Sequence, residues 1–358
     1  MEFSKELLSK FPAILLQWNR NKNTRQMPWK GEKDPYKIWL SEIILQQTRV
    51  EQGLKYYEKF LSHFPNIHKL AAAHEEKVYK LWEGLGYYSR CKNLIETARF
   101  ISKNRDGKFP DRFDDILALK GVGYYTASAI ASFAYELPYA VVDGNVFRVL
   151  SRIFGIKKPI DTAEGKKLFT QLAFELLDKK QPGIFNQAIM DFGAVICKPY
   201  PLCSICPFNN YCIAFKKGLT GVFPVKEKIT SIKPRWFNYL VLENKGRFYI
   251  RKRTGKDIWK SLHEFVLVET EKDISIKKLL SKAEKDRILK KDTYTVISSS
   301  QIYSQQLSHQ KIRGRFIRIK LKQKPVLPGY NLLSANQMLR LAFPRLINSY
   351  FEKDFRND

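Results

Sequence analysis

Residues 119–127 read Leu-Lys-Gly-Val-Gly-Tyr-Tyr-Thr-Ala, and they stand between two segments whose apolar residues recur at helical spacing. The glycines Gly121 and Gly123 permit a tight hairpin with backbone angles that other residues rarely adopt. They also leave backbone N–H groups uncovered where the second helix begins, which suits a phosphate group. A G-x-G pair alone is common in turns. The Leu, Thr and Ala around it are what make this stretch typical of two helices joined by a hairpin.

Helical spacing extends over residues 1–215 and then stops. Residues 216–234 are rich in Lys, Gly and Pro, and we predict that they form a linker. The pattern changes beyond the linker and predicts strands at 236–243, 247–251, 293–303 and 311–324. The length of 358 residues favours two or three domains over one. We therefore expect a mainly α region followed by a domain that contains a sheet.

The charge of the chain indicates its partner. Lys and Arg number 63 against 35 Asp and Glu, a net charge of +28, which favours a polyanion and most often nucleic acid. A source cell whose proteins are generally basic would give the same excess. Basic residues alternate along 311–324 with a slip at 315–318 that is typical of a bulge, and this face suits solvent as well as phosphate. Neither a membrane span nor a signal peptide is expected.

Four of the five cysteines crowd together in the pattern C-x5-C-x2-C-x5-C, formed by Cys197, Cys203, Cys206 and Cys212. Four thiolates at this spacing can hold one iron–sulfur cluster or one tetrahedral ion, and they indicate a reducing compartment. Thiolates alone do not distinguish iron from zinc, but zinc sites usually pair two C-x2-C motifs across a longer loop. The spacing therefore favours a [4Fe–4S] cluster. The fifth cysteine, Cys91, is expected to be an ordinary core or surface residue.

Glu42 stands where a general acid would be expected. Asp34-Pro35 is a typical helix start, and the helix that follows is apolar on almost every side over residues 38–45, with Glu42 among the apolar residues. Burial there would raise the pKa of Glu42 and let it hold a proton at neutral pH. A salt bridge at the helix edge is an equally good interpretation.

Asp143 is the second candidate carboxylate. It follows the apolar run 139–142 and precedes a segment with helical spacing, so its simplest role is to cap that helix. Capping and catalysis are compatible, because the helix dipole would keep the carboxylate ionised.

These motifs occur in an order that resembles the MutY-type adenine DNA glycosylases of the helix–hairpin–helix superfamily. The resemblance covers nearly all of residues 10–215. It rests on the hairpin, the cysteines and three further stretches: Trp-Leu-Ser-Glu-Ile-Ile-Leu-Gln-Gln-Thr at 39–48, Gly-Leu-Gly-Tyr-Tyr-Ser-Arg at 84–90 and Val-Asp-Gly-Asn-Val at 142–146. It implies a mainly α glycosylase region at 1–215, with a six-helix barrel (23–135) and an iron–sulfur lobe (1–22 and 136–215). The linker (216–234) would lead to an α+β Nudix-like domain (235–350) that recognises 8-oxoguanine.

The resemblance also implies an activity, which is removal of adenine mispaired with 8-oxoguanine or guanine in double-stranded DNA. Glu42 would protonate N7 of an extruded adenine. Asp143 would stabilise or transiently attack the sugar, as in glycoside hydrolysis, with Tyr125 and Asn145 in support. DNA would be contacted by a larger set: Arg25, Trp29 and Gln187 around the adenine, Gln47, Thr48, Leu85 and Tyr87 at the gap, Gly121 and Gly123 in the hairpin, and Ser308 and His309 at 8-oxoguanine. The cysteines would hold a [4Fe–4S] cluster in a monomeric, cytoplasmic protein of bacterial type, associated with the nucleoid.

The chain departs from the family pattern in several places. Endonuclease III-like lyases for oxidised pyrimidines carry a catalytic lysine where this chain has Tyr125, so a monofunctional glycosylase is expected. MutY proteins usually have C-x6-C for the first cysteine pair, one residue longer than here. Leu307 replaces the aromatic residue of the Phe-Ser-His loop, and without the Mg²⁺-binding glutamates of Nudix hydrolases no pyrophosphatase activity is expected. A non-enzymatic DNA-binding protein with a zinc site is the remaining alternative, although binding alone would need neither Glu42 nor Asp143.

Overall fold

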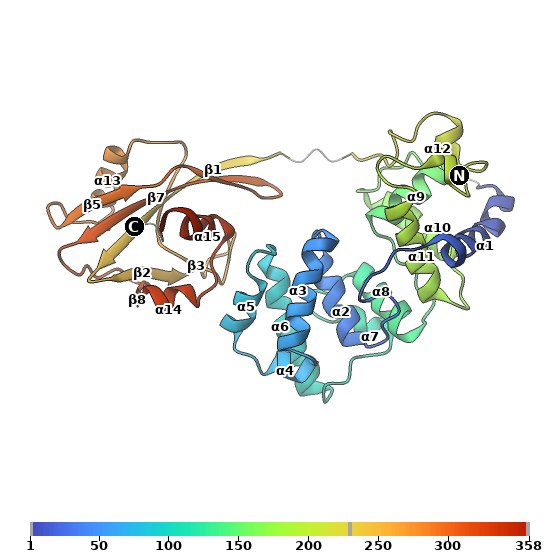
Figure 1. Ribbon diagram of the computed structural model, residues 1–358, viewed down its shortest axis with the longest axis horizontal. Helices are drawn as coiled ribbons and strands as arrows, with labels where there is room; N and C mark the ends of the chain where they lie inside the picture. The colour runs from blue at the N-terminus through green and yellow to red at the C-terminus, as the bar shows by residue number, and fades with distance from the viewer. Residues whose placement is uncertain (1–2, 228–230, 356–358) are drawn as a thin grey trace. The chain divides into compact units, whose positions relative to one another are not determined.

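The computed structural model describes residues 3–227 and 231–355 and contains two compact units (Figure 1). Unit 1 consists of Met1–Ala72 and Glu96–Lys228, and unit 2 consists of Ala73–Ile95 and Ile229–Asp358. Three residues of the predicted linker, 228–230, lie outside the described residues. Within the described ranges, no helix combines the length and the apolar character needed to cross a membrane.

Unit 1 is helical, as predicted. Its helices are α1 (Lys5–Lys22), α2 (Pro35–Leu45), α3 (Val50–His63), α4 (Ile67–Ala71), α7 (Phe113–Leu117), α8 (Tyr124–Tyr135), α9 (Gly144–Phe154), α10 (Ala163–Leu176), α11 (Pro182–Val195), the 3₁₀ helix η1 (Cys203–Ile205) and α12 (Ile213–Lys216). Helix α6 (Tyr88–Asn104) begins in unit 2 and ends in unit 1. Side chains cap many of these helices by accepting a first-turn backbone N–H, among them Ser4, Asp34, Asn66, Asp143 and Thr162.

Helix α1 packs with α10 and α11, which lie far from it in sequence (Figure 1). Phe11 of α1 is fully buried and stacks on Phe208 with the ring centroids 4.7 Å apart. Trp18 meets Phe192 edge-on, with a centroid distance of 5.1 Å. Burying one such ring contributes about 2–3 kcal/mol. The N-terminal helix therefore shares a core with the segment that carries the cysteines.

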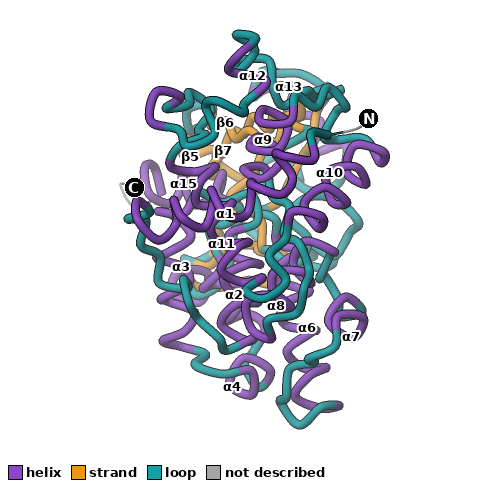
Figure 2. Tube along the Cα trace, turned by 90° about the vertical axis from the view of Figure 1, so that its right-hand side faces the viewer, coloured by secondary structure: helices purple, strands orange, loops and turns teal. Residues whose placement is uncertain are grey.

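The hairpin of residues 119–127 joins α7 to α8, as predicted. Gly121 has a φ of 78°, in the left-handed region that favours glycine, and Gly123 is the N-cap of α8. Val122 points inward while both glycines are exposed. Because α8 packs beside α2 (Figure 2), the hairpin fixes where the first turn of α8 lies relative to α2.

Among its described residues, unit 2 forms an eight-stranded sheet with the path β3-β2-β1-β7-β5, and β4, β6 and β8 pair with β1, β7 and β2 respectively. β1 and β7 are parallel, and the other pairs are antiparallel. The strands are β1 (Lys233–Asn244), β2 (Arg247–Lys252), β3 (His263–Glu264), β4 (Val266–Thr270), β5 (Tyr294–Ser299), β6 (Tyr303–Gln306), β7 (Gln310–Leu321) and β8 (Asn331–Ser334). The helices are α5 (Glu75–Trp82), α13 (Ile276–Lys285), α14 (Ala335–Leu339), α15 (Arg345–Tyr350) and the π-helix η2 (Phe351–Phe355).

The four predicted strand segments are confirmed, but the predicted bulge at 315–318 is wrong. β7 pairs with β1 in one unbroken register over residues 310–320. The irregularity lies instead in β5, between Val296 and Ser298. The slip in the basic pattern arises because β7 is basic on one face at its start and on the other face near its end.

Two of the alternating arginines of β7 are engaged within unit 2. Arg315 pairs with Asp273 at 3.0 Å, and Arg318 pairs with Glu243 at 3.1 Å. Lys311 and Arg313 remain exposed. Part of the basic pattern therefore stabilises the domain itself.

Residues 73–95 belong to unit 2 through contacts of α5, although they lie inside the range predicted for the barrel. Lys80 Nζ donates to the carbonyl oxygen of Leu341 at 2.9 Å. The backbone N–H of Phe343 donates to Glu83 Oε1 at 2.8 Å. These two bonds join α5 and the residue after it to the segment between α14 and α15.

Candidate active site

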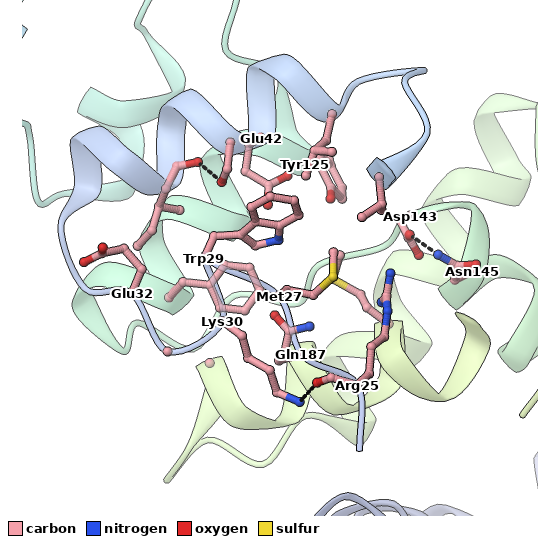
Figure 3. Close-up of a pocket in the computed structure, with 18 of the residues that line it drawn as sticks. Arg25, Met27, Trp29, Lys30, Glu32, Glu42, Tyr125, Asp143, Asn145 and Gln187 are labelled. Atoms are coloured by element: carbon pink, nitrogen blue, oxygen red, sulfur yellow. Dashed lines mark hydrogen bonds between the residues drawn. The ribbon is translucent and has the colours of Figure 1, made fainter. Parts of the chain in front are cut away.

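A pocket of about 1100 Å³ lies in unit 1. It is lined by α2, α8, α9, α11 and the loop from α1 to α2, and its volume slightly exceeds the roughly 300–1,000 Å³ that is usual for ligand sites. Figure 3 shows Glu42 and Tyr125 on one side of the pocket and Gln187, Lys30 and Arg25 on the other. Many predicted site residues line it, namely Arg25, Trp29, Glu42, Gln47, Thr48, Tyr125, Asp143, Asn145 and Gln187.

Glu42 is a buried carboxyl group that faces this pocket. Its helix, α2, is buried on almost every side, so Glu42 is only 7% exposed. The pKa of Glu42 is raised to about 7, chiefly by burial; the hydrogen bond from Tyr125 opposes this rise, and the nearby charge of Asp143 adds to it. The pKa of Tyr125 is raised well above its usual value, chiefly by burial, so its hydroxyl stays protonated as a donor. Glu42 can therefore hold a transferable proton near neutral pH.

Asp143 is both the N-cap of α9 and a wall of the pocket. Its Oδ1 accepts the backbone N–H of Val146 at 2.7 Å, and its Oδ2 accepts Nδ2 of Asn145 at 2.8 Å. Burial raises the pKa of Asp143, while these hydrogen bonds and the charge of Arg148 oppose the rise because they favour the carboxylate. Asp143 thus caps α9 and also lines the pocket, two roles that the sequence analysis found compatible.

Arg148 ties the first turn of α9 to the end of α11 and to Cys197 beyond it. Its Nη2 donates to Asn145 Oδ1 at 2.7 Å and to the carbonyl of Gly193 at 2.8 Å. Its Nε donates to the carbonyl of Cys197 at 2.8 Å. Asn145 is therefore held from both sides, by Asp143 and by Arg148.

Gly193 of α11 allows α9 to come this close. A Cβ at Gly193 would lie 2.6 Å from Asn145 Cβ and 3.1 Å from the Asn145 carbonyl oxygen. We expect Gly193→Ala to reduce the free energy of unfolding by about 1–3 kcal/mol, because the backbone of α9 must move. Urea denaturation measures this effect. Gly255→Ala, where a Cβ would meet nothing within 4 Å, is the control, and equal stability of the two variants would contradict the prediction.

Asp191 is a site residue that the sequence analysis missed. Its buried carboxylate accepts hydrogen bonds from Asn23, Arg25, Lys30 and Gln187, and it therefore organises the wall of the pocket opposite Glu42. The sequence did contain an indication of this role, because Gln187 and Asp191 are four residues apart and therefore share one face of a helix. The sequence analysis also missed Lys30, because its place in the wall of the pocket depends on its contact with Asp191.

The four clustered cysteines all line one small cavity between the end of α11 and α12. Within the described ranges, no three His, Cys, Asp or Glu side chains are grouped closely enough to hold a single metal ion. The buried Arg152 donates from Nη1 to Cys197 Sγ at 3.6 Å. It also donates to the carbonyls of Lys198 and Pro199, at 2.6 and 2.9 Å. Arg152 thereby holds the start of the loop that joins Cys197 to Cys203.

The remaining predicted residues lie outside the pocket lining. Leu85 is buried, while Tyr87 is 43% exposed. Tyr87, like Gln47 of the pocket lining, has a positive φ, 46° for Tyr87 and 55° for Gln47. Residues other than glycine rarely adopt such values, which often mark functional positions. Ser308 and His309 are exposed in the turn between β6 and β7, and Ser308 Oγ forms a hydrogen bond with the Tyr87 hydroxyl. Cys91 is fully buried, as an ordinary core residue would be.

Known proteins resemble this chain over the same regions. The family model for the HhH-GPD superfamily of base excision DNA repair proteins matches residues 40–173. Adenine DNA glycosylase of Buchnera aphidicola subsp. Schizaphis graminum is 39% identical over 267 residues, which cover 73% of this chain and 75% of the relative. Adenine DNA glycosylase of Homo sapiens is 41% identical over 215 residues, which cover 57% of this chain and 39% of the relative.

The structure of a thermostable thymine-DNA glycosylase matches with a TM-score of 0.55 and 29% identity, covering 59% of this chain and 98% of that protein. This match confirms the helical glycosylase fold predicted for the N-terminal region. The sequence similarity to the Buchnera relative extends over 73% of the chain, and the range of the family model contains both carboxyl groups of the pocket, Glu42 and Asp143. The chain therefore belongs to the adenine DNA glycosylases, within the HhH-GPD superfamily of base excision DNA repair proteins.

Proposed function

We propose that this protein removes adenine from duplex DNA at mispairs with 8-oxoguanine or guanine, as a monomeric, monofunctional glycosylase. The observation that carries the proposal is Glu42, a buried acid with a pKa of about 7, in a pocket that Asp143 also lines. The pocket holds both groups that hydrolysis of a glycosidic bond requires, an acid and a carboxylate. The adenine must leave the base stack to reach them.

The reaction follows from the protonation states of the two groups. Glu42 gives its proton to N7 of adenine, and the bond between C1′ and N9 breaks with its electron pair going to the base. The sugar becomes a cation, which Asp143 stabilises as a carboxylate. Water then adds to C1′ and loses a proton to the ionised Glu42, which restores the acid. Tyr125 has no amine to attack the sugar, so no strand cleavage accompanies base release.

Residues 235–350 of unit 2 are proposed to be the Nudix-like domain that reads the base opposite the adenine. Ser308 and His309 are exposed in a turn between strands, where both can reach a partner as hydrogen-bonding groups. The bond between Ser308 and Tyr87 supports a shared role for them. Leu307 can supply apolar contact but no aromatic stacking.

The cysteine cavity is proposed to hold a [4Fe–4S] cluster, bound by Cys197, Cys203, Cys206 and Cys212. Four thiols on one cavity and an arginine N–H directed at a ligand sulfur fit such a cluster. The cluster would link the end of α11 to α12 and carry no part of the glycosidic chemistry. Together with the exposed glycines of the hairpin, this region is proposed to contact the DNA backbone.

A single-turnover cleavage assay tests the function. Matched duplexes carry adenine opposite 8-oxoguanine, adenine opposite thymine, or thymine glycol, and each is analysed with and without alkali. We expect breaks at the mispaired adenine only after alkali. Breaks at thymine glycol without alkali would show a lyase instead, and no cleavage of any duplex would leave a DNA-binding protein without this activity.

The rate of adenine release should depend on pH in a defined way. The active form carries a proton on Glu42 and a charge on Asp143. Because the pKa of Glu42 is about 7, the rate should fall roughly tenfold per pH unit above that value. It should also fall in acid, as Asp143 takes up a proton. Single-turnover rates between pH 5 and 9 measure this profile, and a rate that stays constant from pH 7 to 9 would contradict Glu42 as the acid.

A further inference from the structure

We propose that Asp191 fixes the direction of the Gln187 side-chain amide, so that Gln187 Oε1 faces the pocket and accepts a hydrogen bond from the 6-amino group of adenine. This inference deepens the proposed function and rests on it. Asp191 is then a positioning residue for base specificity, and it acts through Gln187 without touching the base.

The carboxylate of Asp191 has its accepting capacity filled. Its side chain is fully buried. Donors from the described part of the chain reach both oxygens: Arg25 Nη1 and Gln187 Nε2 lie 2.8 and 2.9 Å from Oδ1, and Lys30 Nζ and Asn23 Nδ2 lie 3.0 and 2.9 Å from Oδ2. A carboxylate offers about four lone-pair positions, and the four donors occupy them. Both oxygens of Asp191 are therefore engaged as acceptors.

This acceptor determines which end of the Gln187 amide turns toward the base. An amide side chain has a donor end and an acceptor end, and either could face the pocket if nothing held it. Only Nε2 can pair with Asp191, so Oε1 must be directed elsewhere. Gln187 lines the pocket across from Glu42 (Figure 3). No donor from the described residues is paired with Oε1, which is free to meet a ligand.

An acceptor fixed at this wall distinguishes between purines. Adenine carries an amino group at position 6, which donates, whereas hypoxanthine carries a carbonyl group there, which accepts. Hypoxanthine would place two acceptors face to face and leave both unpaired, which is costly in a desolvated pocket. A glutamine free to rotate would serve either base. The anchor on Asp191 is therefore what makes the glutamine selective.

The test compares single-turnover excision of adenine and of hypoxanthine, each opposite 8-oxoguanine in the same duplex. The readout is the ratio of the two rates in the wild type, Asp191→Asn, Gln187→Met and the double variant. We expect the ratio to fall at least tenfold in each single variant. We expect no further fall in the double variant, because both changes remove the same interaction. A ratio is insensitive to partial loss of folded enzyme, since both substrates meet the same preparation.

Asp178→Asn is the matched control. Asp178 also accepts the Nε2 group of a glutamine, Gln181, at 2.7 Å, but neither residue lines the pocket. The ratio should stay at the wild-type value in this variant. A similar fall in Asp178→Asn would overturn the inference, because the effect would not then be local to the site.

The remaining outcomes distinguish failure of the inference from failure of the proposed function. An unchanged ratio in Gln187→Met would overturn the inference even if Asp191→Asn did not fold. The inference would also be overturned if Asp191→Asn lowered the ratio in the Gln187→Met background by as much as it does in the wild type. If the wild type releases no adenine at all, the proposed function fails and the inference falls with it. Adenine release with unchanged ratios would remove the inference and leave the function in place.

Discussion

Glu42→Gln is expected to release adenine about 10³-fold more slowly than the wild type at pH 7, which is within the usual range for removal of a general acid. The amide has nearly the same shape and can still accept the hydrogen bond of Tyr125. It has no proton to give to N7, so adenine would have to leave as an anion. A single-turnover assay on the duplex with adenine opposite 8-oxoguanine measures the loss.

A surface carboxylate provides the control for Glu42→Gln. Glu6 of α1 is exposed and pairs only with Lys10, at 2.7 Å, among the described residues. Glu6→Gln should therefore cleave at the wild-type rate. Duplex binding by Glu42→Gln, measured by gel shift, should also be retained, because the lost step follows binding. A Glu42→Gln rate within tenfold of the wild type would exclude Glu42 as the proton donor.

Asp143→Asn is expected to lower the same rate by about 10²–10³-fold, a typical cost of removing one fixed electrostatic group from a transition state. The sugar is most positive when its bond to adenine is nearly broken, and a neutral amide cannot offset that charge. Asparagine caps helices as well as aspartate does, so α9 should still begin at Gly144. The measurement is again single-turnover cleavage, accompanied by thermal melting.

Asp34→Asn separates capping from catalysis. Asp34 caps α2 by accepting the backbone N–H of Tyr36 at 2.9 Å, and it does not line the pocket. This variant should keep both stability and rate. If Asp143→Asn melts earlier but cleaves at the wild-type rate, Asp143 serves only as a cap and the proposed role in charge stabilisation is wrong.

The features that the sequence predicts well depend on a few neighbouring residues. The hairpin needs the positive φ of Gly121, and Asp143 needs only the free N–H groups of the helix that it precedes. Glu42 could be recognised because apolar residues surround it along a single helix. In each case the preference of a few neighbouring residues is the same as the structure that the whole chain adopts.

Long-range contacts could not be predicted in the same way. Asp191 became a site residue only when α11 brought it next to Arg25 and Lys30, more than 160 positions earlier in the chain. Strands β3, β4 and β8 are short, at two to five residues, which is too few for a periodic pattern. The packing of 73–95 in unit 2 involves hydrogen bonds to backbone atoms far along the chain, which the composition of the segment does not predict.

The burial of Glu42 also has a consequence for selection. Its pKa is about 7 in the folded protein, against an ordinary value of 4.5, so the folded state keeps a proton that the unfolded chain releases. Stability therefore decreases as the pH rises from 4.5 to 7, and above pH 7 the ionised group costs about 3 kcal/mol. Glutamine at this position would escape that cost. In a population selected for heat resistance alone, with no demand for repair, replacement of this glutamate should therefore be favoured.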